Sequence, residues 1–401
     1  MKKISGIQIF RIAVLTFFLV VVTVISYQHQ KLGGGPTGAP SIHSVCPFGA
    51  LETVYKVIAG GEYLKRTNAS NFILFGAIVV LTFLFGRYFC GFLCALGWMQ
   101  ELVGKLGKLI FKKRFAVPKA IDAPLRYLKY VALIVILIFT WKLGDLIVSP
   151  YDPFAAFAHF SAGFGELFGE FLIGSIIFIL MLVLSLFYDR LFCKYLCPMG
   201  AFLALMNKIS FFRIKRDKSS CINCALCSKI CPVNIDVAKI DSVKSAECIN
   251  CMECVTVCPT KKNTLKTTIF GFNLKPFVIA IMGVAIYLGT IGVTNALGVW
   301  KTLPSNLIEL VKKDGKLDPF SVRGFMTLED VSKLFKIDMD VLYNELNLDK
   351  NIVPKNTKVK ELDKFDKNIT EEFFRETVAK IIGLKKESGE DENSTIIKEL
   401  K

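Results

Sequence analysis

The sequence predicts a mostly α-helical integral membrane protein that also carries a small cysteine-rich α+β domain and a small helical domain near its C-terminal end. Three observations lead to this fold class. Hydrophobic residues make up 53% of the 401 residues and the mean hydropathy is +0.48, which is too apolar for an ordinary soluble protein. The apolar residues are gathered in about five blocks of membrane-spanning length. Closely spaced cysteines lie between these blocks, and residues 301–401 are polar.

The apolar blocks predict about five transmembrane helices, at residues 7–26, 71–89, 125–143, 171–187 and 275–299. The first block makes residues 1–26 an N-terminal transmembrane segment, in which Arg11 is expected to extend toward the headgroups. No small-residue cleavage site follows this block directly, which favours a retained helix over a cleaved signal peptide. Residues 27–70 form the loop that leads to the second helix.

The distribution of Lys and Arg predicts the orientation of the helices. Roughly 24 of these residues lie in the N-terminus and the 87–126 and 189–275 loops, against roughly 5 in the opposite loops. The N-terminus and the cysteine-rich region are therefore expected in the cytoplasm, and the C-terminus outside, in a multi-pass plasma-membrane protein. The formal net charge of +16 suits contact with anionic lipid and with an acidic redox partner.

The most specific motif lies between Cys221 and Pro259. It reads CINCALCSKICP and, after an interval, CINCMECVTVCP. This C-x2-C-x2-C-x3-C-P run is typical of bacterial ferredoxins with two [4Fe–4S] clusters, in which the fourth cysteine of each run ligates the other cluster. We therefore expect a ferredoxin domain over residues 211–265, with the ligand sets Cys221, Cys224, Cys227 and Cys258 for one cluster and Cys248, Cys251, Cys254 and Cys231 for the other. A zinc ribbon or a disulfide knot is the disfavoured alternative.

A second repeat lies in the membrane region, residues 71–210, at the ends of two predicted helices. Residues 87–97 and 190–200 share the pattern R-x-F-C-x-aromatic-L-C-x-x-G. A C-x3-C spacing puts both sulfurs on one face of a helix. Two such helices side by side predict a third cluster or metal centre, and the alternatives are a redox-active dithiol or plain helix packing. The candidate ligands are Cys90, Cys94, Cys193 and Cys197. The arginines Arg87 and Arg190 are expected to be interfacial anchors.

The remaining cysteine and all three histidines lie on the predicted outer side. Their position suggests an outer metal site, weighed against the simpler interpretation that they are dispersed loop residues; its members would be His29, His43, Cys46 and His159. His159 and Asp152 also suggest a pair that accepts protons from a quinol. No predicted helix contains a histidine, which argues against haem with two axial histidines. Electrons that cross the membrane would need thiolate-bound centres, a quinone or a partner subunit.

Residues 301–401 predict a small helical domain. About 19 basic and 20 acidic side chains leave it near neutral, so its charge does not oppose export. Thr327 is expected to open one helix and Thr370 to cap an amphipathic one. Residues 328–348 have the outline of a helix-turn-helix, but the predicted outer location argues against binding to nucleic acid. The tail after Gly389 is expected to be disordered.

Residues 70–260 resemble the membrane polyferredoxins encoded with periplasmic nitrate reductase, nitrous-oxide reductase and cytochrome oxidase assembly genes. The resemblance depends on two span-terminal C-x3-C(P) motifs followed by the tandem ferredoxin motif. Ala95 departs from the family pattern, which has a proline there, and the N-terminal flavin-attachment domain of the nitrous-oxide type is absent. The resemblance implies a cytoplasmic two-cluster domain that passes electrons between a cytoplasmic or quinol donor and an acceptor across the membrane.

We therefore predict a membrane-anchored iron–sulfur electron carrier, or an oxidoreductase subunit, whose donor is a ferredoxin, a flavodoxin or a reductase subunit. The chain shows no nucleotide loop, hydrolytic triad or carboxylate pair in the context that such motifs require, which argues against an independent enzyme. Two alternatives stay open. One is a maturation factor that reduces a metal for a respiratory enzyme, and the other is a redox sensor.

Overall fold

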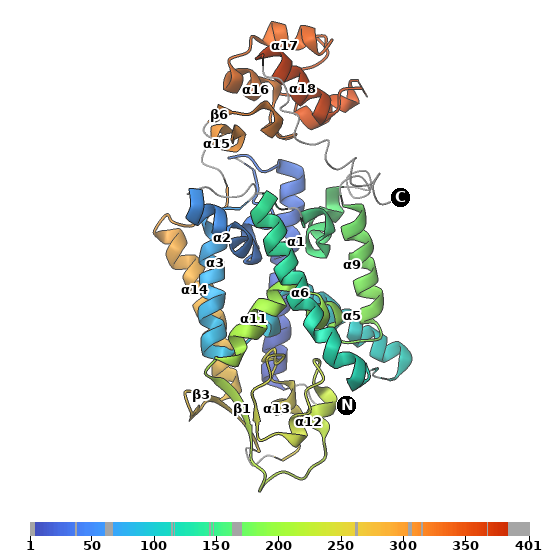
Figure 1. Ribbon diagram of the computed structural model, residues 1–401, viewed down its shortest axis with the longest axis vertical. Helices are drawn as coiled ribbons and strands as arrows, with labels where there is room; N and C mark the ends of the chain where they lie inside the picture. The colour runs from blue at the N-terminus through green and yellow to red at the C-terminus, as the bar shows by residue number, and fades with distance from the viewer. Residues whose placement is uncertain are drawn as a thin grey trace. The chain divides into compact units, whose positions relative to one another are not determined.

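The computed structural model describes residues 5–36, 38–60, 67–113, 115, 117–143, 146, 148–162, 171–260, 264–303, 307–313, 316–366 and 368–383. The chain divides into two compact units (Figure 1). The first unit comprises Met1–Lys31 and Pro40–Thr302, and the second comprises Leu32–Ala39 and Leu303–Lys401. The predicted disordered tail after Gly389 lies outside the described residues.

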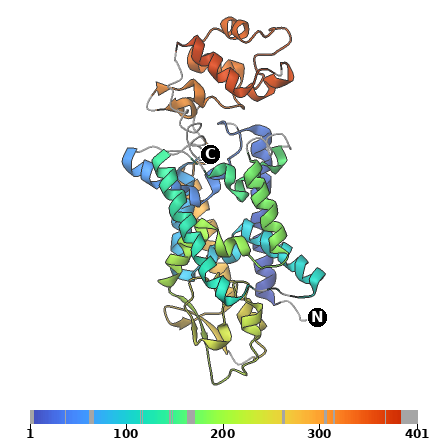
Figure 2. The ribbon, with the colours of Figure 1, turned by 45° about the vertical axis from the view of Figure 1, so that its right-hand side comes forward.

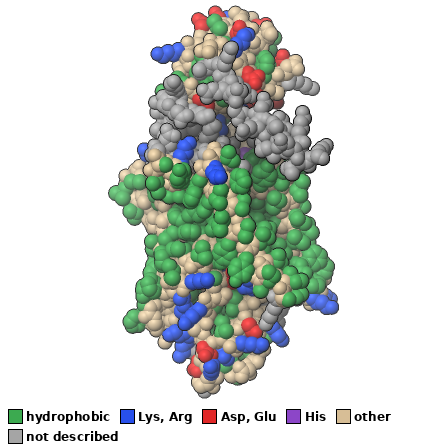
Figure 3. All heavy atoms as spheres, in the orientation of Figure 1, with side chains coloured by type: hydrophobic (Ala, Val, Ile, Leu, Met, Phe, Trp, Pro, Cys, Tyr) green, Lys and Arg blue, Asp and Glu red, His purple; other side chains and the backbone are tan. Residues whose placement is uncertain are grey.

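Three helices of the first unit are long and apolar enough to cross a membrane: α1 (Gly6–Leu32), α6 (Lys119–Leu143) and α14 (Pro276–Ala296). Two other apolar helices, α3 (Ala69–Phe85) and α9 (Leu172–Ser185), are shorter, with 17 and 14 residues. On the face shown in Figure 3, hydrophobic side chains form a band around these helices. The structure thus confirms a membrane protein that is mostly helical, with three candidate spans where the sequence predicted about five.

Shorter helices complete the first unit and join the apolar ones. They are η1 (His43–Val45), α2 (Phe48–Gly60), α4 (Tyr88–Phe92), α5 (Ala95–Phe111), η2 (Ser149–Tyr151), α7 (Pro153–His159), η3 (Phe160–Ala162), α10 (Leu191–Tyr195) and α11 (Pro198–Lys208). In their packing, helices of each half of the internal repeat contact helices of the other half. Helix α5, which follows α3 in sequence, packs against α9, while α11, which follows α9, packs against α3 and α6. Each half of the duplicated region therefore packs against a helix that follows the cysteine repeat of the other half, and we call these two helices, α5 and α11, the exchanged arms.

The cysteine-rich region forms a four-stranded antiparallel sheet in the order β2-β1-β3-β4. The strands are β1 (Phe212–Arg216), β2 (Ser242–Val243), β3 (Leu265–Ile269) and β4 (Phe272–Asn273), with the short helices η4 (Val237–Lys239), α12 (Leu226–Ile230) and α13 (Glu253–Val257) between them. In the register of β1 and β3, Phe212 pairs with Ile269. The sheet directly follows α11 and directly precedes α14, so both ends of this region are fixed to helices (Figure 2).

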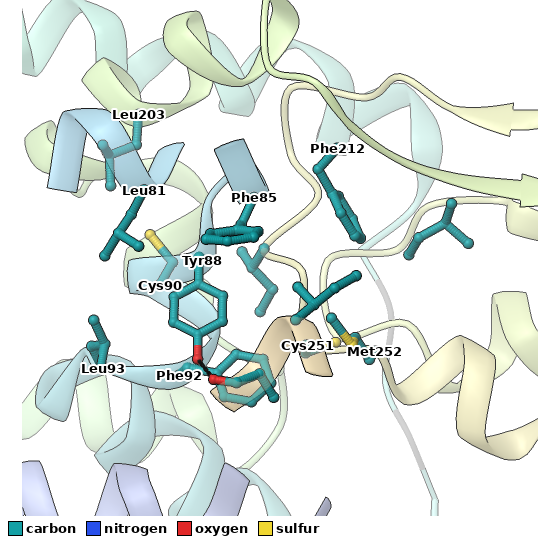
Figure 4. Packing of buried hydrophobic residues seen from close by; sticks show 14 of the residues in the cluster. Leu81, Phe85, Tyr88, Cys90, Phe92, Leu93, Leu203, Phe212, Cys251 and Met252 are labelled. Atoms are coloured by element: carbon teal, nitrogen blue, oxygen red, sulfur yellow. Dashed lines mark hydrogen bonds between the residues drawn. The ribbon is translucent and has the colours of Figure 1, made fainter. Parts of the chain in front are cut away.

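One hydrophobic core joins the membrane helices of the first unit to its cysteine loops. Buried Leu81 and Phe85 of α3 share this core with Phe212 of the sheet and with Cys251 and Met252 of the second cysteine run (Figure 4). Met252 is fully buried. Burial of a large apolar side chain stabilises a fold by roughly 1.5–3 kcal/mol. The cysteine-rich region is therefore part of the body of the first unit and not a separately folded appendage.

The second unit has its own core, built from the helices α15 (Leu307–Val311), η5 (Pro319–Ser321), α16 (Leu328–Phe335), α17 (Met339–Glu345), η6 (Val359–Lys364) and α18 (Glu371–Ile381), and from the hairpin of β5 (Lys312–Lys313) and β6 (Lys316–Leu317). Thr327 caps α16 and shares a capping box with Asp330. Thr370 caps α18 by accepting a hydrogen bond from the Phe373 amide. Both predicted helix starts are confirmed.

Candidate metal centres

The two ferredoxin-type cysteine runs have the same unusual backbone. In the first run Asn223 and Ala225 have φ of 53° and 57°, and in the second Asn250 and Met252 have φ of 55° and 59°. Asparagine tolerates this left-handed conformation, but alanine and methionine rarely adopt it. A strained backbone that recurs at equivalent positions is typical of loops that wrap a ligand.

Each run contributes cysteines to two cavities. The linings of the two cavities differ in their residues. Three cysteines of the first run and the last cysteine of the second run line the first cavity, and the reverse holds for the second cavity. The sets are Cys221, Cys224, Cys227 and Cys258 for the first, and Cys231, Cys248, Cys251 and Cys254 for the second. This is the grouping that an exchanged fourth ligand requires.

The two cavities differ in their exposure to solvent. Cys224 at the first cavity is exposed, whereas Cys231, Cys251 and Cys254 at the second are buried. The second cavity therefore lies deeper in the first unit, against the helices that carry the other cysteine repeat.

The loop around the second cavity is clamped to those helices by side chains of the membrane region. Asn207 of α11 donates to the carbonyl oxygens of Ser245 and Cys248, at 3.0 and 3.3 Å. Asn250 of the loop donates to the Phe85 carbonyl at 2.6 Å. Gly91 lies so close that a Cβ there would be 2.2 Å from the carbonyl oxygen of Ile249. Only glycine at position 91 permits this backbone contact between the two cysteine-bearing segments.

The C-x3-C repeats do not lie on continuous helices, which corrects the prediction that both sulfurs share one helix face. Cys90 lies in α4, but Cys94 is the N-cap of the next helix, α5. The Cys94 Sγ accepts a hydrogen bond from the Gly97 amide at 3.3 Å, which replaces the helical bond that this amide lacks. Cys193 in α10 and Cys197, the N-cap of α11, repeat the arrangement. The thiol thus has a capping role that the spacing alone did not predict.

The same geometry explains why Ala95 can replace the family proline. Pro198 occupies the first position of α11, where proline's fixed φ suits a helix start. Ala95 occupies the first position of α5, and alanine is also well tolerated there. Both helices begin in the same way, so the substitution leaves the cysteine geometry intact.

The structure brings all four repeat thiols together. Burial raises the pKa of Cys94 to about 12, and the nearby Cys193 and Cys90 contribute to the shift. Burial, followed by the neighbouring Cys193, Cys94 and Cys90, also raises the pKa of Cys197 well above its ordinary value. A metal centre bound by these four thiols would displace their protons.

A single metal ion fits neither group of cysteines. Among the described residues, no three His, Cys, Asp or Glu side chains lie close enough to bind one ion. This finding includes the eight cysteines of the ferredoxin motif.

Buried ion pairs surround the four repeat thiols. Arg11 and Arg190 both bind Glu101, at 2.5 and 2.9 Å. Arg87 and Lys129 both bind Glu247, at 3.4 and 2.5 Å. Burial alone would raise the pKa of Glu101, but the Arg11 and Arg190 guanidiniums hold it below its ordinary value.

The predicted roles of three arginines are wrong. Arg11 and Arg190 are 0% exposed and Arg87 is 1% exposed, so none is a membrane-surface anchor. Arg11 reaches inward to the Gly91 carbonyl at 2.8 Å instead of extending toward headgroups. Their partners come from segments far away in the chain, which a local pattern cannot reveal. The sequence signal for these buried contacts was the presence of the same arginine and the same glycine in both copies of the repeated pattern.

The predicted outer residues are dispersed over several elements. The His43 ring bonds Ser149 at 3.0 Å, while the His159 ring bonds Gln30 at 2.9 Å and stacks on Phe171. His29 lies in the last turn of α1. Asp152 caps the N-terminus of α7 and His159 ends this helix, so the two lie at opposite ends of a helix about 10 Å long. The outer metal site and the quinol pair stay predictions.

A carboxylate that the sequence analysis missed lies next to Cys46. Glu52 of α2 is only 8% exposed, and burial together with the charge of Asp152 raises its pKa to about 8. Burial and the charges of Asp152 and Glu52 also raise the pKa of Cys46, to about 12. The sequence signal was a lone acidic residue within the otherwise largely apolar stretch 47–54.

Comparisons with known families agree with these sites. Residues 67–115 and 171–219 match the family model described as a 4Fe-4S binding domain, and residues 213–259 match a 4Fe-4S dicluster domain. The first match covers both C-x3-C repeats, and the second covers the tandem cysteine runs. The number of clusters is not fixed by these matches.

Several curated proteins are similar to the chain. An uncharacterized protein of Methanocaldococcus jannaschii is 38% identical over 49% of this chain and 76% of its own length. YccM of Escherichia coli, provisionally named an electron transport protein, is 31% identical over 50% of this chain and 56% of its own. The ferredoxin-type protein NapH of Haemophilus influenzae is 29% identical over 40% and 53%. The matched part thus spans little more than half of the last two relatives. No solved structure matches the chain.

Proposed function

The chain belongs to the polyferredoxin family of 4Fe-4S proteins, to which NapH, NosR and YccM are related, and from that premise we propose that it carries electrons across the membrane through three iron–sulfur centres. It is an iron–sulfur, ferredoxin-type electron transport protein with membrane helices. The proposal concerns the finer points: the number of centres, their order, the direction of crossing and the partners.

The observation that carries the proposal is the spatial order of the three cysteine groups. The first cavity has an exposed cysteine, the second is buried, and the second touches the four-thiol group through the contact of Gly91 with Ile249. When bound, each [4Fe–4S] cluster supplies a site that accepts or gives up one electron. In the proposal these sites form a series that begins at the exposed cysteine of the first cavity and ends at the four repeat thiols.

The ligands follow from the cavity linings and from the exchange of arms. Cys221, Cys224, Cys227 and Cys258 would hold the first cluster, and Cys231, Cys248, Cys251 and Cys254 the second. The third would be held by the repeat thiols, Cys90, Cys94, Cys193 and Cys197. Backbone amides of Gly97 and Gly200 donate to two of these sulfurs, and Gln100 donates to a third, Cys193, at 3.1 Å. Hydrogen bonds to ligand sulfur are characteristic of iron–sulfur sites.

Five helices would cross the membrane in this proposal. Helices α3 and α9 are about 26 and 21 Å long, shorter than the hydrocarbon thickness of about 30 Å. Local thinning of the bilayer accommodates short spans at modest cost. The bias of Lys and Arg then places the ferredoxin region in the cytoplasm and residues 303–401 outside.

The electron donor would be a small acidic protein such as a flavodoxin or ferredoxin. Lys218 and Lys239 flank residues that line the first cavity and are 68% and 78% exposed. Cys224 and the apolar Ile222 are exposed at the same place. Lys218 is paired with Asp241 and Lys239 with Asp236, and an acidic partner would compete with these carboxylates for the two lysines beside the apolar patch.

Iron content tests the proposal. Protein purified without oxygen should contain about twelve irons, and the double variant C90S/C193S should lose about four while its ferredoxin signals stay. The matched control is Cys46→Ser, which removes a thiol outside the three groups and should lose none. A wild type with about eight irons would refute the third centre.

Fusion reporters test the crossing. A reporter at residue 262 should show a cytoplasmic location and one after residue 401 an exported location. If both report the cytoplasm, the five-helix arrangement is wrong.

The rival role as a metal-reducing maturation factor gains its support from Cys46, which lies with Glu52 and Asp152 on the side opposite to the ferredoxin region in the five-helix arrangement. A deletion strain would separate the two. Loss of a partner enzyme's metal while membrane electron flow persists would favour maturation.

A further inference from the structure

Arg87 and Arg190 have equivalent places in the two repeats, yet each lies in the other's half. The Nη1 of Arg190 is 2.8 Å from the position of a Cβ on Gly97, and the Nη2 of Arg87 is 3.1 Å from that of a Cβ on Gly200. Gly97 and Gly200 are the third residues of α5 and α11. Each guanidinium therefore lies beside the start of a helix that a cysteine of the opposite repeat caps.

This placement collects positive charge at one point. The N-terminal ends of α5 and α11 carry partial positive charge from their aligned peptide dipoles, and each now has a buried cation beside it. The neighbouring ion pairs do not cancel the excess. Arg11, Arg87, Lys129 and Arg190 are at most 1% exposed, while their carboxylate partners within the described part of the chain are Glu101, Glu247 and the partly exposed Glu253. Uncompensated buried charge is costly unless an anion is bound.

Two donors also lack acceptors. The Nε of Arg87 and the Nε of Arg190 are buried, and neither has a hydrogen-bond partner within the described part of the chain. Arg87 is electrostatically coupled to Cys90 and Cys197, and Arg190 to Cys193 and Cys94. Each arginine thus lies near thiols of both repeats and keeps one N–H group free of a protein acceptor.

We infer that Arg87 and Arg190 are crossed counter-charges of the four-thiol centre, which set its reduction potential. The inference depends on the third centre of the proposed function. With clusters bound, one electron would pass between the second ferredoxin cluster and the four-thiol centre, and no bond would form or break. The added electron would make an anionic centre more negative, so two adjacent guanidiniums would stabilise its reduced form and raise its potential. A raised potential favours transfer of the electron toward the four-thiol centre.

The experiment is a redox titration followed by electron paramagnetic resonance on the full chain, purified without oxygen. The variants are R87Q and R190Q, with R87K and R190K as charge-conserving partners. The control is R126Q, because the Arg126 guanidinium is paired with Asp122 and donates to the Val233 carbonyl, and neither partner is a thiol. Iron content is measured for each protein.

In the two Gln variants we expect the potential of the third signal to fall, while the ferredoxin signals hold their potentials. The Lys variants should regain most of the loss, and R126Q should match the wild type. Loss of about four irons in the Gln variants but not in the Lys variants would also support the inference, because charge alone would then be needed for assembly. An unmoved third signal, an equal shift in R126Q, or iron loss in both Gln and Lys variants would overturn it. A wild type without a third signal would refute the centre itself.

Discussion

The guanidinium of Arg190 lies where a side chain on Gly97 would begin, at 2.8 Å from that position. It is held there by hydrogen bonds to the Cys90 carbonyl at 2.6 Å and to Glu101 at 2.9 Å. Gly97 has ordinary helical backbone angles, so its glycine is explained by the space that the arginine needs. The glycine that ends the repeated pattern is therefore explained by its contact with the arginine that begins the pattern in the other copy.

Substitution of this glycine should disturb the repeat centre. Gly97→Ala is expected to push Arg190 from its two partners, with a cost of about 1–3 kcal/mol from overpacking. Thermal unfolding of the purified protein should show a lower midpoint and a changed third spectral signal. Gly289→Ala in α14 is the matched control, since nothing lies within 4 Å of a Cβ at that position. Equal midpoints for the two variants would contradict the explanation.

Gly91 should govern the contact between the second cavity and the repeat thiols. A Cβ on Gly91 would meet the Ile249 carbonyl at 2.2 Å, and a backbone atom cannot move aside as a side chain can. Gly91→Ala is therefore expected to separate the two segments and to slow reduction of the third centre. Rapid-freeze spectroscopy after addition of reductant would measure this step. The ferredoxin clusters should still be reduced at the wild-type rate, and a third centre reduced as fast as before would contradict the proposed order.

The buried carboxyl of Glu52 is expected to make the folded protein less stable as pH rises. Its pKa is about 8 in the folded protein because burial and Asp152 disfavour its charge, whereas an unfolded Glu has a pKa near its ordinary value. Between these values the folded state binds more protons, so stability should decrease with pH by up to roughly 1.4 kcal/mol per unit between about pH 5 and pH 8.

Glu52→Gln removes this titration. The variant should unfold at the same temperature as the wild type near pH 5 and at a higher temperature near pH 8. Glu376→Gln, at an exposed position of α18, serves as the control and should follow the wild type at both pH values. A wild type whose unfolding temperature does not depend on pH in this range would refute the buried, mostly protonated carboxyl.

The two exposed lysines beside the first cavity, Lys218 and Lys239, should control the rate of reduction by an acidic donor. Lys218→Glu combined with Lys239→Glu is expected to slow reduction by flavodoxin about tenfold at low salt, with a smaller difference at high salt because exposed charges are screened. Stopped-flow measurement at two ionic strengths provides the test. Lys380→Glu, an exposed lysine of the second unit, is the control. Slowing that persists unchanged at high salt would point to damage instead of lost attraction.

The spacing of the cysteines predicted the cavity linings because cluster ligation is a local sequence property. The grouping of Cys258 with the first run and of Cys231 with the second appears in the structure as that pattern requires. The capping threonines of the second unit were equally readable, since Thr327 and Thr370 act on amides three residues away.

Among the described residues, α3 is shorter than the span that the sequence predicted, and the reason is local. The apolar block 71–89 continues past Gly86, whose φ of 68° ends α3. Hydropathy does not detect this turn, because the apolar residues of α4 follow directly after Arg87. The exchange of arms and the burial of Arg87 depend on contacts between distant segments, and no single stretch of sequence contains that information.

The exchanged arms also bear on how such a chain could arise. In a chain with only one repeat, the arginine would lack the glycine that it contacts in the other copy, and the glycine would lack its arginine. Two copies of that chain, side by side, would satisfy both needs. The duplicated region thus has the form of a symmetric homodimer joined into one polypeptide, in which α6 and the loops around it serve as the connection. Ala95 and Pro198, the first residues of α5 and α11, are equivalent positions at which the two halves differ in sequence.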